Sequence, residues 1–133
     1  MKFDITYENR TTLSVDRAGA EALGYPEEVI VEAERGVRKK SVKGECRRRI
    51  YAAASAETQM NMATAAAYAS SKTASARSDE EKSVIAGVEA SLAWVAEMRG
   101  NVATLVADFD LDISDDANWP VCPEAALAVV AMY

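Results

Sequence analysis

Apolar residues recur at helical spacing over residues 78–105, the longest such pattern in the chain. They are Val84, Val88, Val95, Met98, Val102 and Leu105, and the stripe is widened by Ile85, Leu92 and Val106. This spacing places them on one face of an α-helix, which would be about 40 Å long at roughly 1.5 Å per residue. A helix of that length needs a neighbour to cover its apolar face, either within the chain or in a partner.

Ser78 marks the start of this helix, because it stands three residues before Glu81. At this spacing each side chain can accept a hydrogen bond from the other residue's free backbone N–H, as in a capping box. Asp79 and Glu80 add negative charge at the positive end of the helix dipole. We therefore expect the helix to begin directly after Ser78.

The first fifteen residues predict a β-hairpin, with residues 8–10 as its turn. The apolar positions alternate with polar ones: Phe3, Ile5 and Tyr7 in the first strand, and Leu13 and Val15 in the second. Two strands alone are only marginally stable in water, so the hairpin must pack on a helix or extend another sheet. After it, Asp16 can cap a short helix that Gly24 ends.

A second helical region extends from Pro26 to about residue 71, with glycine only at Gly36 and Gly44 and many alanines over residues 52–69. A single helix of more than forty residues would be long for a globular domain, so we expect a break near Gly44 or within residues 55–58. The small side chains let helix backbones approach closely, which favours an antiparallel hairpin with the helix over residues 78–105.

Residues 108–113 alternate aspartate with Phe109, Leu111 and Ile113, and two more aspartates follow. A calcium loop of the helix–loop–helix type would need glycine at its sixth position and glutamate at its twelfth, which hold Ile113 and Trp119. We therefore predict no metal site. The period of two favours a short strand or extended segment, with its apolar side chains inward and its carboxylates in water.

These patterns predict one mainly α domain over residues 1–133. A long antiparallel helical hairpin over residues 26–107 forms its centre, preceded by the small β-hairpin and a short helix over residues 1–25. Residues 108–133 add the extended acidic segment, a Trp-Pro anchor and a short C-terminal helix. No apolar run approaches the ~20 residues that cross a bilayer, and the first residues lack a secretory signal, so we expect a cytoplasmic protein without membrane contact.

The charges of the chain are unevenly distributed around a net charge of −6. Eight of the fifteen basic residues lie within residues 35–49, whereas no Lys or Arg follows Arg99. The basic block is either a nucleic-acid patch or a helix surface that pairs with acidic segments of this chain or of a neighbouring subunit. We favour the second interpretation, because an acidic protein repels a polyanion at long range and no aromatic residue interrupts the block to stack bases.

Residues for catalysis are largely missing from the sequence. There is no histidine, the commonest general acid and base and the commonest metal ligand. Nucleophile-elbow and glycine-rich phosphate-loop motifs are also missing. Cys46, beside three arginines, and Cys122 are expected to be free thiols, and a cysteine hydrolase is hard to build without a histidine. We therefore predict a protein that is not an enzyme, with no catalytic residue and no cofactor.

One resemblance covers roughly residues 27–124. The acidic turn at residues 78–82, the periodic helix that carries Trp94, and the ending Trp119-Pro120-Val121-Cys122-Pro123 resemble the C-terminal half of tailed-bacteriophage tail-fibre assembly proteins. The charged helix that leads into residues 47–50 resembles the first helix of the pair in that family. The resemblance implies a non-enzymatic protein that binds the distal part of a trimeric tail fibre, helps it to fold or assemble, and in some members stays on the virion.

The chain departs from that family in its longer alanine-rich segment over residues 52–76 and in its alanine-rich C-terminal tail. A permanent structural part of the tail is therefore as consistent with the resemblance as a chaperone. We expect phage tail-fibre or other tail proteins as partners, in the host cytoplasm during assembly or in the virion tail. Two alternatives stay open: a small acidic phage-encoded inhibitor of a host protein, and a helical DNA-binding regulator that uses the basic block.

A thin, alanine-heavy core would leave apolar helix surface to be covered, so we expect self-association or a place in a larger assembly. The predicted protein-interaction residues are Val84, Val88, Leu92, Val95, Met98, Trp119, Pro120 and Pro123. The apolar stripe could equally be ordinary core. The Trp-Pro residues either fasten the C-terminus onto the helical pair, which we favour, or contact a partner directly.

Overall fold

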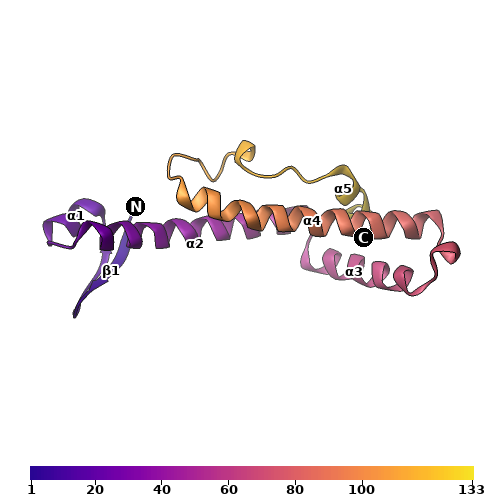
Figure 1. The fold of residues 1–133 in the computed structure, drawn as a ribbon, viewed down its shortest axis with the longest axis horizontal. Coiled ribbons are helices and arrows are strands. Elements are labelled where there is room, and N and C mark those ends of the chain that lie inside the picture. Colours follow the sequence, from indigo (N-terminus) through magenta and orange to yellow (C-terminus); the bar gives the residue numbers. More distant parts are fainter.

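The chain folds into an elongated, mainly helical molecule, for which a computed structural model describes all 133 residues. Helices contain 68% of the residues, and a two-stranded antiparallel hairpin lies at the N-terminus, which confirms the expected fold class. Figure 1 shows the hairpin and the first short helix at one end of a long helical pair. The C-terminal segment returns along the other half of that pair.

The hairpin consists of β1 (Phe3–Tyr7) and β2 (Arg10–Val15). Phe3 and Ile5 are buried, as expected, because they face the long helix that follows. Tyr7 is 39% exposed instead, because it lies near the hairpin tip, which projects away from that helix (Figure 1). The hairpin is thus anchored at its base only.

The short helix α1 (Arg17–Ala22) begins at Asp16, whose carboxylate accepts a hydrogen bond from the Gly19 N–H at 2.9 Å. Gly24 then adopts a φ of +78°, which lets the chain turn into the next helix without strain on a side chain. A small core joins hairpin, α1 and the start of the next helix: Phe3, Ile5, Ala20, Tyr25 and Ile30.

The second helical region is broken at one of the two places that the sequence predicted. Helix α2 (Glu27–Ala53) continues through Gly44 and ends at Ala54, which is extended. Ser55 then caps α3 (Ala56–Ser71) by accepting a hydrogen bond from the Thr58 N–H at 3.1 Å. The break therefore lies at the serine cap, because a serine side chain can satisfy the free N–H groups of a new helix.

Helix α4 (Asp79–Ala107) follows a short 3₁₀ turn, η1 (Ala74–Ala76). Its predicted capping box is confirmed: the Glu81 N–H donates to Ser78 Oγ at 3.1 Å, and the Ser78 N–H donates to the Glu81 carboxylate at 3.4 Å. Helix α4 runs antiparallel to both α2 and α3 (Figure 1). The helical hairpin therefore has one continuous arm and one arm that is split in two.

Residues 108–123, which we name the C-terminal strap, form no strand; their only regular element is the 3₁₀ turn η2 (Asp116–Asn118). Asp108, Asp112 and Asp115 each accept a hydrogen bond from the backbone N–H two residues ahead, at 2.8–3.0 Å. The first two of these aspartates lie four residues apart, and with Asp110 between them they imitate the two-residue period of a strand. Leu111 and Ile113 do pack inward, as expected, whereas Phe109 is exposed.

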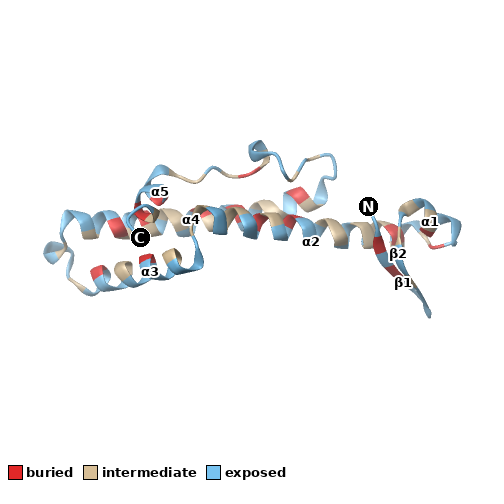
Figure 2. Cartoon of the chain, turned by 180° about the vertical axis from the view of Figure 1, so that it is seen from behind, coloured by how far each residue is buried: buried red, intermediate tan, exposed pale blue.

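The last helix, α5 (Glu124–Val130), crosses α4 at Gly87. A Cβ atom at Gly87 would lie 2.7 Å from Cβ of Val129 and 2.9 Å from the carbonyl oxygen of Ala125. The absence of a side chain thus permits the close crossing. Figure 2 shows the buried residues spread in short stretches along α4 and at the hairpin, without one central core.

The molecule exposes more surface than a compact monomer of its size. Its accessible surface is 8374 Å², whereas a compact monomer of 14.3 kDa would expose about 6,800 Å². The excess of about a fifth agrees with the thin core expected from the alanine content. No helix is both long and apolar enough to span a membrane.

Candidate protein-interaction surface

The apolar stripe of α4 divides between the core and the surface. Val84 and Met98 are buried, at 3% and 1% exposure, so they pack within the chain. Val88 and Val95 are half-buried beside them. Leu92 is 66% exposed. Of the five predicted contact residues on α4, Leu92 is therefore the one whose side chain is open to a partner.

The Trp-Pro residues fasten the strap to the helical pair. The Trp119 side chain is buried, and its indole N–H donates to the carbonyl oxygen of Ile113 at 2.8 Å. The Trp94 indole N–H donates to the carbonyl oxygen of Pro120 at 3.0 Å. Pro123 opens α5. These contacts favour the interpretation of the three residues as an internal anchor.

Two arginines of α2 hold the strap in place. The Arg38 guanidinium donates to the carbonyl oxygens of Leu105, Asp108 and Leu111 at 2.9, 2.9 and 2.6 Å. It thereby supplies the positive charge at the C-terminal end of α4 that α4 itself lacks in its last turn. Part of the basic block thus binds the acidic segment of the same chain.

Arg49 makes a second connection, to Asp116 at 2.7 Å and to the carbonyl oxygen of Ser114 at 3.0 Å. Its Nε donates to Glu45, which also accepts from Arg48. The hydrogen bond from Arg48 and, less strongly, that from Arg49 hold the pKa of the Glu45 carboxyl below its usual value. This face of α2 is therefore an internal ion-pair network.

The other basic residues of the block have a different environment. Lys39, Lys43 and Arg47 follow one another at intervals of four residues along α2, and Arg99 lies across from them on α4. None of the four has an ion-pair partner, although Arg47 lies over the Tyr51 ring at 5.0 Å.

These four cations edge an open groove between α2 and α4, which we name the basic groove. Its floor is apolar and is formed by Ile50, Val95, Val102 and Val106. No residue of the strap lines it. The helical pair therefore has one face covered by the strap and one face open to solvent.

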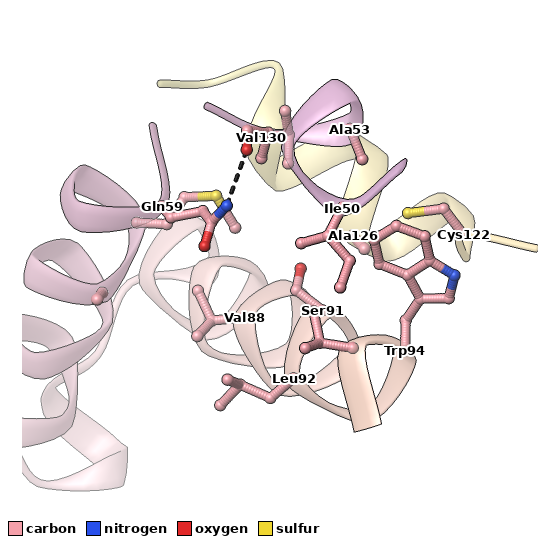
Figure 3. Close-up of a pocket in the computed structure, with 14 residues that line it drawn as sticks. Ile50, Ala53, Gln59, Val88, Ser91, Leu92, Trp94, Cys122, Ala126 and Val130 are labelled. Atoms are coloured by element: carbon pink, nitrogen blue, oxygen red, sulfur yellow. Dashed lines mark hydrogen bonds between the residues drawn. The ribbon is translucent and has the colours of Figure 1, made fainter. Parts of the chain in front are cut away.

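An apolar cavity of about 250 Å³ adjoins the basic groove, at the break between α2 and α3 (Figure 3). Figure 3 shows Ile50, Val88, Leu92 and Trp94 around it, with the C-terminal segment closing the far side. The groove and the cavity share Ile50 and Val95, so together they form one continuous surface. The Gln59 amide at its edge is occupied, since it donates to the Ala54 carbonyl oxygen at 2.8 Å.

The two cysteines are free, as the sequence predicted. Burial raises the pKa of both the Cys46 and the Cys122 thiol. Thiolate is the nucleophilic form, so the arginines beside Cys46 in the sequence do not make it a reactive cysteine. No group of three or more metal-ligating side chains comes together in the molecule.

Sequence reasoning missed both the basic groove and the cavity. The cations at residues 39, 43 and 47 carried a signal in their four-residue spacing, which places them on one edge of a helix. The cavity had no such signal, because it is bounded by three stretches that are distant in the sequence, residues 50–63, 88–95 and 122–130. No protein-family model matches the chain, and neither does any of the curated proteins.

Proposed function

We propose that the protein is a non-enzymatic binding module of a bacteriophage tail. It binds tail-fibre or other tail proteins, either as an assembly chaperone in the host cytoplasm or as a component that stays in the virion tail. The assignment to a phage tail rests on the resemblance of roughly residues 27–124 to tail-fibre assembly proteins. The binding role rests on the surface described above.

The open face of the α2–α4 pair is the observation that carries the proposal. A helical pair of this length is stable when both faces are covered, and here the strap covers one face only. The exposed Leu92, the apolar floor of the basic groove and the adjoining cavity offer contiguous apolar surface. Contiguous apolar surface with a polar edge is typical of protein-binding sites.

The test is co-expression of the tagged protein with the products of its neighbouring genes and with phage tail-fibre and tail proteins. Co-purification of one tail protein in a fixed ratio, measured by size-exclusion chromatography with light scattering, supports the proposal. A stable monomer that retains none of these proteins contradicts it. Turnover of any substrate that a single polar substitution abolishes would contradict the non-enzymatic part.

The same material separates the two alternatives. A DNA-binding regulator would retard a DNA duplex in a gel, and the shift would collapse between low and physiological salt. An inhibitor of a host protein would co-purify with a host enzyme in cells that lack the other phage genes. Either result would replace the tail assignment.

A further inference from the structure

We infer that the basic groove and the adjoining cavity bind an amphipathic helix of the partner protein, with acidic residues along its edges and a bulky apolar side chain at one end. The inference builds on the proposed binding function and names the chemistry of the partner segment. Four features of the groove support this assignment: its charges, its floor, its length and the cavity at its end.

The groove carries an excess of positive charge, because the one carboxylate that lines it, Glu32, is paired with Arg35 at 3.2 Å. Lys39, Lys43 and Arg47 repel one another, since like charges four residues apart destabilise a helix. Arg99 adds a fourth positive charge from the facing helix. The other arginines of the basic block form ion pairs or bind carbonyl oxygens, and of the unpaired cations of the block only Lys40 lies outside the groove. Carboxylates on a partner would relieve that repulsion.

The floor of the groove fits a helix better than it fits a phosphate backbone. The valine side chains of the floor make no favourable contact with phosphates, whereas they can bury the apolar face of a helix. These valines are Val95, Val102 and Val106. Gly36 and Ala103 on the walls are small, and the space beside Gly36 is open to at least 4 Å. A partner backbone can therefore come close to the floor.

Between Gly36 and Ala53 the groove and the cavity extend along α2 for about 25 Å, at ~1.5 Å per residue. A partner helix of about 17 residues would fill that length. The cavity of about 250 Å³ lies at its end. An apolar cavity of about 150 Å³ is large enough to hold benzene. The larger cavity of this protein can therefore hold one aromatic or leucine side chain.

A second copy of this chain does not supply such a helix. The apolar face of its longest helix, α4, is already packed through Val84, Met98 and Leu105. The alanine-rich helix α3 carries a single acidic residue, Glu57. The acidic strap is irregular and is held by Arg38 and Arg49. None of these three segments combines a free apolar face with acidic edges, so we assign the groove to a segment of another protein.

The experiment measures binding of a fluorescein-labelled, 17-residue synthetic peptide by fluorescence anisotropy. The peptide has leucines at helical spacing on one face, glutamates beside them and one tryptophan near its end. Two control peptides are used: one with every glutamate replaced by glutamine, and one with the same composition in scrambled order. We expect the acidic helix to bind at least tenfold more tightly than either control, with an affinity that falls as salt rises.

The protein variants test where the peptide binds. Lys43→Glu combined with Arg99→Glu reverses charge on both sides of the groove and should weaken binding at least tenfold. Lys40→Glu is the matched control, because Lys40 is exposed on the same helix but does not line the groove, and it should leave binding unchanged. Leu92→Asp places a charge at the cavity and should weaken binding of the tryptophan peptide. Circular dichroism of each variant confirms that the fold is retained.

Three results overturn the inference: equal binding of the acidic and scrambled peptides, unchanged binding by the charge-reversed variant, or a DNA duplex that binds the same groove more tightly than the peptide. A dimer of the wild type that the charge-reversed variant dissociates would also overturn it, in favour of a second copy. If a tail protein still co-purifies with the charge-reversed variant, the inference fails and the proposed function stands. If the peptide binds as expected but no tail protein co-purifies, the proposed function fails alone.

Discussion

The crossing of α4 and α5 gives a sharp test of the fold, because two glycines of α4 differ in what surrounds them. Gly87 has Val129 and the Ala125 carbonyl oxygen within 3.0 Å of the position that a Cβ would take. Gly100, in the same helix, has nothing within 4 Å. At either position, alanine should favour the helix by about 1 kcal/mol over glycine through its higher helix propensity. Only the space beside the residue should make their effects differ.

We expect Gly100→Ala to stabilise the protein by about 0.5–1 kcal/mol. Gly87→Ala gains the same propensity but must displace α5 against a backbone oxygen, an overpacking cost of about 1–3 kcal/mol. The net effect is a loss of up to about 2 kcal/mol, and the difference between the variants is about 1–3 kcal/mol. The free energy of unfolding is measured by urea denaturation followed by circular dichroism. Equal stabilisation by both variants would show that α5 does not cross α4 at Gly87.

Two further predictions concern the charges of α2. Arg38→Met should lower the free energy of unfolding by about 2–4 kcal/mol, measured by urea denaturation, because three carbonyl oxygens lose a charged donor. It should also raise the rate of hydrogen exchange in the strap. The control variant Lys40→Met should change the free energy of unfolding by less than about 0.5 kcal/mol. The lowered pKa of Glu45 stabilises the fold above the ordinary carboxyl pKa of about 4.3, and this contribution is lost as the pH falls through the lower, folded-state pKa. Glu45→Gln should therefore flatten the pH dependence of the unfolding free energy in acid, and an unchanged slope would refute the pairing with Arg48.

Local signals in the sequence were sufficient to predict the starts of α1, α2 and α4, but not that of α3. Ser78 and Glu81 satisfy each other's backbone N–H groups without help from the rest of the chain, so their spacing alone identified the start of α4. The break at Ser55 was one of two predicted places, and the sequence could not choose between it and Gly44. Gly44 stays helical because an exposed glycine lowers helix stability without preventing the helix.

The strap was harder to predict, because two physical causes produce the same period. Asp108 and Asp112 each accept a hydrogen bond from the second following N–H, and with Asp110 between them they alternate as the outward residues of a strand do. What separates them is the position of Arg38, which binds the strap carbonyls of Asp108 and Leu111 that a strand would have offered to a neighbouring strand. That arginine is 67–73 residues away in the chain, so no local pattern contained it.

The roles of the basic block also depend on residues that are distant in the sequence, but its helical spacing contains part of the information. Counted as one group, its charges suggested a single role, either pairing with acidic segments or contact with a polyanion. On a helix, however, positions 38, 42, 46 and 49 share a face, and positions 39, 43 and 47 share the next one. The first face carries the buried Val42 and Cys46 and the two arginines that hold the strap, whereas the second carries the unpaired cations of the basic groove. Because the two arginines that hold the strap lie on the first face, the cations of the second face can bind another molecule without disturbing the strap.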